Sequence, residues 1–310
     1  TICFYLYGFS YKEKFYNLNK ETFDYKIRVI GSNISIDRFY SNINPVSVIE
    51  ELIDISKPNN KEKTIFIWPE GIFPGIFQDQ LKEYNWLFNK NFNDNHFFII
   101  GINSQSSGNQ YKNYHNTFSI YDDKLNLLNS YNKINLVPFG EFLPLEKFLK
   151  FIGLKSITNN YQPFSKGQKR EILEIKKENF LLKILPLICY EIIYSGELFA
   201  DPNFDLIVNI SEDGWFGHSI GPRQHFVHSF LRAIESGKYV LRSSNNGIAA
   251  VINPLGDIEK KVEFGKSGYI DFQEIRKMKP TIFSLYGNKI FIILIFFYVF
   301  LIFLLKKFKY

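Results

Sequence analysis

The chain has 310 residues, of which 45% are hydrophobic and 22% are charged, and its formal net charge is +6. Aromatic residues reach 18%, which excludes a disordered chain, and the length suits one large domain or two small ones. The middle of the chain has no cluster of lysines and arginines interleaved with aromatics, so we expect no nucleic-acid partner.

The first ten residues, "TICFYLYGFS", are mostly apolar and precede a polar, lysine-rich segment. We interpret residues 1–10 as the end of an N-terminal membrane helix. The chain begins with Thr1 and its only methionine is Met278, so we expect more membrane helices before this one. A processed signal peptide is the alternative, although the residues show no cleavage-site pattern.

Short β-like runs then alternate with amphipathic stretches, which predicts a layered α/β domain over residues 25–275. Two helices are expected, at 46–56 and at 222–238; the second places apolar residues on one face and ends at a glycine. Polar residues 103–110 are expected to form a loop. Residues 239–245 and 247–257 predict a final hairpin with a turn near Pro254–Gly256. The remaining strands are expected at 25–31, 63–70, 96–103, 116–122, 181–191 and 204–211.

The C-terminal run Ile290–Leu305 is apolar throughout and is flanked by lysines. As a helix it would be about 24 Å long, and lysine side chains reaching to the interface can close the gap to a ~30 Å hydrocarbon core. We therefore predict a transmembrane helix over residues 288–306, with a buried core helix as the alternative. Lys306 and two further lysines follow the run, which predicts a cytoplasmic C-terminus and a catalytic domain on the outer side.

The only two cysteines are Cys3 and Cys189. They provide neither a disulfide framework nor a zinc site, and we expect no metal and no cofactor. Cys189 ends the apolar run "LPLIC" and is followed closely by Glu191. A buried structural cysteine needs no charged neighbour, whereas a nucleophilic cysteine needs a base or a cation.

Glu70 and Lys133 also stand where predicted strands give way to loops. Taken singly, each of these residues is ordinary: a loop carboxylate, a surface lysine and, at Cys189, a small hydrophobe. Taken together, they suit covalent catalysis. A carboxylate can accept the thiol proton, and an ammonium group can stabilise the thiolate and the oxyanion that forms on a carbonyl. The five histidines suggest no pairing with the cysteine.

Four motifs resemble the nitrilase, or carbon–nitrogen hydrolase, superfamily and, within it, the membrane-bound apolipoprotein N-acyltransferase branch. They are "WPEG", "YNKINLVPFGEFLP", "ICYE" and "NISEDGWFGHSIGPRQH". The resemblance covers roughly residues 25–305. It implies an αββα sandwich and a catalytic triad of Glu70, Lys133 and Cys189. It also implies supporting roles for Glu141, Tyr190 and Glu191.

The chain departs from the family pattern in two loops. It carries Glu212–Phe216 where the family has Asn-Asp-Ala-Trp-Phe, which puts the shape of that loop in question. In an earlier loop, Phe39 or Tyr40 stands where the family has tryptophan. We expect Trp215, Phe216 and Tyr40 to bind substrate or to form a lid at the lipid surface, with ordinary packing as the alternative.

The resemblance implies an acyl transfer through a Cys189 thioester. The donor would be a phospholipid and the acceptor the N-terminal amine of a diacylglyceryl-cysteine apolipoprotein. It places the chain, as a monomer, in a bacterial inner membrane with its catalytic domain on the periplasmic face. Two alternatives stay open: a membrane-tethered nitrilase or amidase that hydrolyses a small amide, and a membrane-anchored binding or scaffold module.

Overall fold

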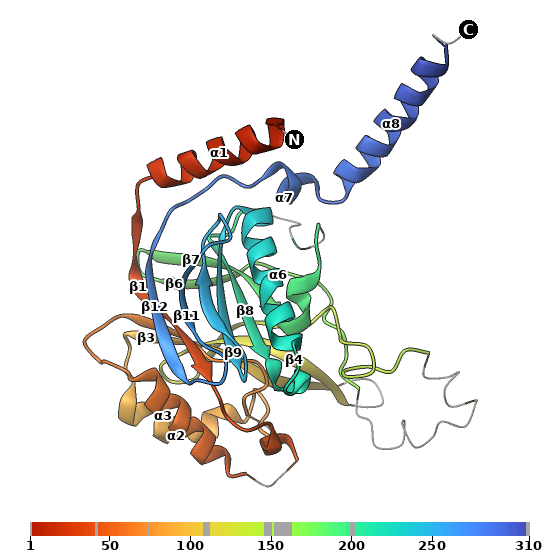
Figure 1. The fold of residues 1–310 in the computed structure, drawn as a ribbon. Helices are drawn as coiled ribbons and strands as arrows, with labels where there is room; N and C mark the ends of the chain where they lie inside the picture. Colours follow the sequence, from red (N-terminus) through yellow and green to blue (C-terminus); the bar gives the residue numbers. More distant parts are fainter. Residues whose placement is uncertain are drawn as a thin grey trace.

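A computed structural model describes most of the chain (Figure 1). It covers residues 2–40, 43–73, 75–107, 112–145, 151, 163–196, 198 and 202–307, with the side chains of Cys3 and Phe4 left out. All statements below concern these described residues.

One half of the β-structure is a mixed sheet in the order β5-β4-β3-β2-β1. β1, β2 and β3 are parallel, and β4 is antiparallel to both of its neighbours, β3 and β5. A further strand, β12 (Gly268–Ile275), pairs antiparallel with β1. The five strands are β1 (Glu21–Ser32), β2 (Thr64–Ile67), β3 (His96–Ser107), β4 (Lys112–Asp122) and β5 (Leu127–Asn132).

The other half has the order β9-β8-β7-β6, in which β7, β8 and β9 are parallel and β6 is antiparallel to β7. β10 pairs antiparallel with β9, and β11 pairs with β10. The strands are β6 (Leu173–Lys177), β7 (Phe180–Ile188), β8 (Leu206–Glu212), β9 (Tyr239–Asn245), β10 (Ala249–Ile252) and β11 (Ile258–Val262).

The two halves join only at the ends of β1 and β9, where Gly31 and Ser32 pair with Ser244 and Asn245. Elsewhere they face each other, and β4 lies against β7 while β5 lies against β6. Buried side chains from both halves fill the space between them, including Val29, Ile67, Ile120, Ile188 and Val208. The strands therefore form a two-layer sandwich around one apolar core.

Helices cover the outer face of each half (Figure 1). On the first, α2 (Pro45–Ser56) and α3 (Asn85–Asn91) bury apolar side chains against β1, β2 and β3. On the second, α6 (Gly221–Ser236) packs against the sheet through Phe226 and Ala233. The expected αββα sandwich is confirmed. Short 3-10 helices occur at η1 (Ile36–Phe39), η2 (Leu81–Tyr84), η3 (Cys189–Ile193) and η4 (Asp213–Phe216).

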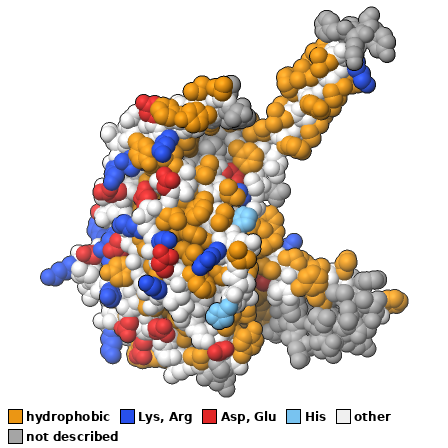
Figure 2. Space-filling view, in the orientation of Figure 1, with side chains coloured by type: hydrophobic (Ala, Val, Ile, Leu, Met, Phe, Trp, Pro, Cys, Tyr) orange, Lys and Arg blue, Asp and Glu red, His pale blue; other side chains and the backbone are white. Residues whose placement is uncertain are grey.

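Both ends of the chain are helical. α1 (Ile2–Asn17) lies across one end of the sandwich, and α7 (Ile282–Tyr286) leads into α8 (Lys289–Lys307), which projects away from the domain (Figure 1). Apolar side chains cover α8 on the face seen in Figure 2. Among the described residues, only Lys289–Lys306 forms a helix long and apolar enough to cross a membrane, and none of it is buried. A membrane position for residues 1–10 stays a prediction.

Some expected element boundaries are wrong. β7 ends at Ile188 rather than continuing to residue 191, because Cys189 takes a left-handed conformation with φ +48°. Residues 103–107 belong to β3 rather than to a loop, because their backbone pairs with β4 despite polar side chains. The turn at Pro254–Gly256 connects β10 to β11, so the hairpin of β9 and β10 is not the last one.

Gly101 in β3 permits a close approach of two chain segments. A Cβ atom at this position would lie 2.4 Å from the Glu70 Cα atom and 2.6 Å from the Pro69 carbonyl oxygen. The backbone of β2 therefore continues beside β3 past the end of the strand. A side chain at residue 101 would displace Glu70.

We predict that Gly101→Ala destabilises the fold by about 1–3 kcal/mol through overpacking. Denaturant unfolding in detergent, followed by tryptophan fluorescence, measures the effect. Gly268→Ala is the matched control, because a Cβ atom there would meet only ordinary contacts with Val262. Equal stability of the two variants would contradict the close approach.

Candidate active site

The loops that follow four strands bring the expected catalytic residues into one region. Glu70 follows β2, Lys133 follows β5, Cys189 follows β7, and Asp213 follows β8. In a sandwich of parallel strands, such carboxyl ends lie at the same edge. Glu70, Lys133 and Cys189 are all buried, with 6%, 1% and 7% of their surfaces exposed.

Lys133 lies between two carboxylates. Its Nζ atom is 3.2 Å from Glu70 Oε1 and 2.9 Å from Glu141 Oε1. Burial lowers the pKa of Lys133, but Glu70 and Glu141 more than offset it and hold that pKa well above its ordinary value. Lys133 is therefore a fixed buried cation at neutral pH.

Both oxygens of Glu70 are held. Asn116 donates from Nδ2 to Glu70 Oε1 at 2.7 Å and to Glu141 Oε1 at 2.9 Å, and the Glu212 backbone N–H donates to Glu70 Oε2 at 2.9 Å. Glu141 Oε2 accepts from the Val137 backbone N–H at 2.9 Å. Neutral hydrogen-bond donors thus fix the carboxylates of Glu70 and Glu141 around the Lys133 ammonium group.

Cys189 interacts electrostatically with this cluster. Burial and the Glu70 carboxylate raise the pKa of the Cys189 thiol well above its ordinary value, and Lys133 partly offsets them. The sulfur is therefore protonated at neutral pH. A nucleophilic step then needs a base to accept the proton, and a buried carboxylate such as Glu70 can do so.

Glu191 anchors the segment that carries the cysteine. Its Oε2 accepts from the Ile188 backbone N–H at 2.9 Å. Its Oε1 accepts from the Tyr131 hydroxyl at 2.6 Å, from Arg170 Nη2 at 2.7 Å and from two backbone N–H groups after Lys133. Glu191 thereby ties the β7 end to the Lys133 loop. The Tyr190 ring makes an edge contact with the Tyr194 ring, with 5.9 Å between the ring centroids.

The aromatic residues expected at a lid gather into one exposed group. Trp215 lies 4.9 Å from the Phe39 ring and 6.5 Å from the Tyr40 ring, and Tyr40 and Trp215 are 78% and 54% exposed. Phe216 is 37% exposed and lies 5.5 Å from the His225 ring. We call Phe39, Tyr40, Trp215 and Phe216 the aromatic rim.

The unusual Glu212 is explained by a partner that sequence reasoning missed. Its carboxylate forms a buried ion pair with Arg38 and also accepts from Asn245 at 2.7 Å. Burial raises the pKa of Glu212, and Arg38 opposes this shift. Arg38 and Asn245 therefore hold the Glu212 carboxylate at the start of η4.

Sequence reasoning also missed Asn116, Arg170 and the pair of Asp213 with Arg242. Asp213 lies in the quoted motif "NISEDGWFGHSIGPRQH" and Asn116 opens a predicted strand, but neither pattern indicates the partner of the residue. His225 contacts the cysteine through its backbone, because Nε2 of the ring lies 3.1 Å from the Cys189 carbonyl oxygen. The sequence feature that could have indicated this contact is the position of His225 on the predicted helix 222–238, which packs behind the cysteine segment.

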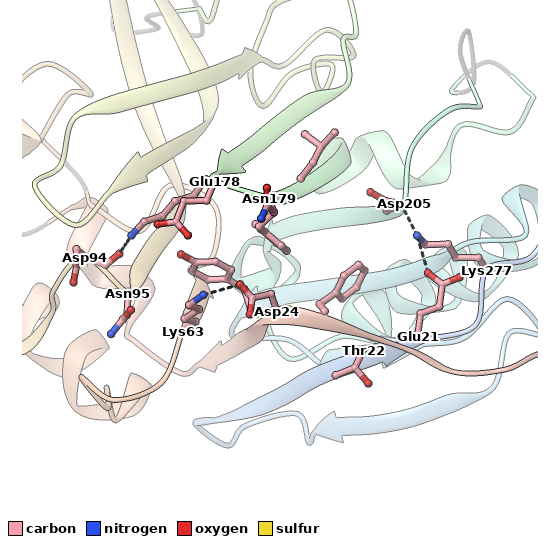
Figure 3. A pocket seen from close by; sticks show the side chains of 15 residues that line it. Glu21, Thr22, Asp24, Lys63, Asp94, Asn95, Glu178, Asn179, Asp205 and Lys277 are labelled. Atoms are coloured by element: carbon pink, nitrogen blue, oxygen red, sulfur yellow. Dashed lines mark hydrogen bonds and ion pairs between the residues drawn. The ribbon is translucent and has the colours of Figure 1, made fainter.

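A second hollow, of about 620 Å³, lies at the opposite ends of the strands (Figure 3). Acids and lysines that precede β2, β3 and β8 line it. Several of them already pair, as Lys63 does with Asp24 at 2.8 Å and Lys277 with Glu21 at 2.9 Å. It has neither a cysteine nor a buried lysine, so the chemistry described above belongs to the other edge.

Residues 54–277 match the model of the carbon–nitrogen hydrolase family. Together with the sandwich and its buried Glu–Lys–Cys cluster, this shows that the chain belongs to that family. Among solved structures, a mutant of an amidase from Nesterenkonia shares the fold, with a TM-score of 0.55 over 84% of this chain and 94% of that one at 12% identity. Nit3 of Saccharomyces cerevisiae, a nitrilase-superfamily member, has a TM-score of 0.53 at 17% identity over 83% of this chain and 91% of its own.

Curated relatives point to one branch of the family. The chain is 31% identical to the apolipoprotein N-acyltransferase of Caulobacter vibrioides over 87% of its length and 52% of the relative's. It is 35% identical to that of Rickettsia prowazekii over 86% and 52%, and 34% identical to that of Wigglesworthia glossinidia over 85% and 52%. The chain therefore spans about half the length of these relatives.

We predict opposite pH shifts when the two charged neighbours of Cys189 are neutralised. Alkylation of Cys189 by iodoacetamide, read by peptide mass spectrometry, should have a midpoint above the ~8.5 of a free thiol. Glu70→Gln removes a negative charge, which favours the thiolate and lowers the midpoint. Lys133→Met removes a positive charge and raises the midpoint.

Glu174→Gln is the control for this measurement, because Glu174 is an exposed acid on β6 whose lysine partner is 3.8 Å away. It should leave the midpoint unchanged. A shift of the Glu70 and Lys133 variants in the same direction would show that the two groups do not act on the sulfur as charges.

Proposed function

We propose that this chain carries the catalytic half of an apolipoprotein N-acyltransferase. The observation that carries the proposal is the buried Glu70–Lys133–Glu141 cluster beside a protonated, buried Cys189. The exposed aromatic rim beside the cluster and the apolar helix α8 support a lipid substrate. The similarity to named acyltransferases supports this branch over a hydrolase.

The first half of the reaction forms a thioester. Cys189 attacks the ester carbonyl of a phospholipid while Glu70 accepts the thiol proton. Lys133 stabilises the oxyanion of the tetrahedral intermediate. The bond from the carbonyl carbon to the glycerol oxygen then breaks, and Glu70 returns the proton to the leaving lysophospholipid.

The second half releases the enzyme. The free α-amine of a diacylglyceryl-cysteine lipoprotein attacks the thioester carbonyl, and Glu70 accepts a proton from the amine. The carbon–sulfur bond breaks to form the amide, and the proton returns to the Cys189 sulfur. Glu141 and Glu191 keep Lys133 and the cysteine segment in place throughout, and Tyr190 supports the nucleophile.

The proposed setting follows from the same residues. α8 would cross a bacterial inner membrane with its lysine-rich end in the cytoplasm, which leaves the sandwich on the periplasmic face. The aromatic rim would meet the acyl donor at the bilayer surface, where aromatic side chains are favoured.

Acyl transfer from a labelled phospholipid to a synthetic diacylglyceryl lipopeptide tests the function. The unmodified chain should accumulate label on Cys189 as a hydroxylamine-sensitive thioester when the lipopeptide is omitted. Cys189→Ala should abolish both the thioester and the transfer, because it removes the nucleophile. Cys3→Ser is the matched control and should retain both.

Full transfer by Cys189→Ala would overturn the covalent step. Hydrolysis of small amides with no turnover of phospholipid would instead favour the membrane-tethered amidase. A Cys189 that is inert to both substrates and to alkylation would favour a binding module.

We predict that Trp215→Ala lowers transfer from vesicle phospholipid roughly tenfold, through loss of about 1.4 kcal/mol of apolar contact with the lipid. Alkylation of Cys189 by a small reagent should stay unchanged. Trp86→Ala is the matched control, because Trp86 on α3 is 55% exposed and lies outside the aromatic rim. Equal losses of transfer activity in the two variants would show that Trp215 makes no specific contact with the lipid.

A further inference from the structure

A buried polar network lies behind the nucleophile and is not used in the mechanism above. His225 on α6 is 4% exposed, and its Nε2 atom lies 3.1 Å from the Cys189 carbonyl oxygen. A carbonyl oxygen only accepts hydrogen bonds, so Nε2 carries the hydrogen and donates it. The helix behind the cysteine segment thus contacts the backbone of the nucleophile itself.

The orientation of the His225 ring is set by Asp213. Nδ1 of the ring lies 2.9 Å from Asp213 Oδ1, and Arg242 Nη2 donates to both oxygens of Asp213 at 2.9 and 2.8 Å. Burial raises the pKa of Asp213, but Arg242 and His225 more than offset this and hold it below its ordinary value. The ring is therefore held against a fixed carboxylate.

Cys189 needs such support because its backbone is strained. Its φ of +48° lies in the left-handed region, which a residue with a side chain rarely adopts. Asn209 approaches the same carbonyl oxygen at 3.5 Å and also donates to the Leu187 carbonyl at 3.1 Å. Of these two side-chain donors, His225 makes the shorter contact.

We propose that His225 is a positioning residue whose Nε2–H group holds the Cys189 backbone in its left-handed conformation and so keeps the sulfur beside Lys133 and Glu70. The proposal rests on Cys189 being the nucleophile, as in the proposed function. Without the donor, the backbone of Cys189 relaxes and the sulfur moves away from both Glu70 and Lys133.

The charged and titratable groups around this pair come from several elements. Those facing Cys189 are Glu70, Lys133 and Asp213. Those facing His225 are Asp213 from η4, Arg242 from β9, and His228 on α6 itself, which Arg232 also approaches. The His225 variants below keep all of these neighbouring groups, so a change in the pH profile of Cys189 reports the position of the sulfur.

The test compares His225→Gln with His225→Asn in the full chain. The Gln amide reaches the place of Nε2 and can donate to the Cys189 carbonyl, whereas the shorter Asn amide reaches only the place of Nδ1. We expect His225→Asn to move the midpoint of Cys189 alkylation to lower pH, because Glu70 raises the pKa of the thiol more than Lys133 lowers it. We also expect the limiting rate to change roughly tenfold, the scale of small misplacements of reacting groups. His225→Gln should restore most of the rate and the midpoint.

His228→Gln is the control on the same helix and should behave as the unmodified chain. Thermal melting checks that the variants fold. Wild-type rate and midpoint in a folded His225→Asn protein would overturn the proposal, as would equal defects in the Gln and Asn variants. Alkylation needs no lipid substrate, so a normal His225 dependence without phospholipid turnover would refute the proposed function and leave the positioning role intact.

Discussion

The site depends on burying one cation between two acids. Lys133 is almost fully inaccessible, and burial of an unpaired ammonium group would cost several kcal/mol. Glu70 and Glu141 supply the compensating charge, and Asn116 satisfies an oxygen on each. No member of this group can be buried alone, so the loops after β2 and β5 must close together against Asn116 of β4.

The fold brings the buried lysine and its two acids together because the two half-sheets join at one edge. β1 and β9 pair only at their carboxyl ends, and the loops that carry Glu70, Cys189 and Asp213 begin at the same edge. Gly101 lets the chain after β2 run close against β3, and Glu191 binds the end of β7 to the loop of Lys133. The charges of Glu70 and Lys133 then face the cysteine side chain, and α6 packs against the other side of the cysteine segment.

This arrangement leaves the sulfur protonated, which separates it from a thiolate nucleophile activated by histidine. Burial and Glu70 outweigh Lys133 in setting the pKa of Cys189. In the proposed mechanism, activation coincides with attack, when Glu70 accepts the proton and Lys133 faces the developing negative charge. In the same proposal, the nearby aromatic rim gives a lipid a place to lie outside this closed polar cluster.

Much of this could be predicted from the residues alone. Apolar runs with β-branched and aromatic side chains gave the strands, and helical spacing gave α2 and α6, because periodicity reflects which face is buried. Element ends were less predictable. Polar residues 103–107 extend β3 because backbone pairing with β4 outweighs their side-chain character, and β7 ends at Ile188 because the next residue, Cys189, is left-handed.

The sequence by itself determined the alternation of strands and helices, the apolar helix at the C-terminus and the three residue types that suit covalent chemistry. Only the tertiary structure decided which partners surround them. Arg38, Asn116 and His225 lie far along the chain from Glu212, Glu70 and Cys189, and their local sequence does not indicate these partners. The physical reason is that a buried charge or carbonyl is satisfied by whichever group the packing brings within about 3 Å, and packing is a property of the whole fold.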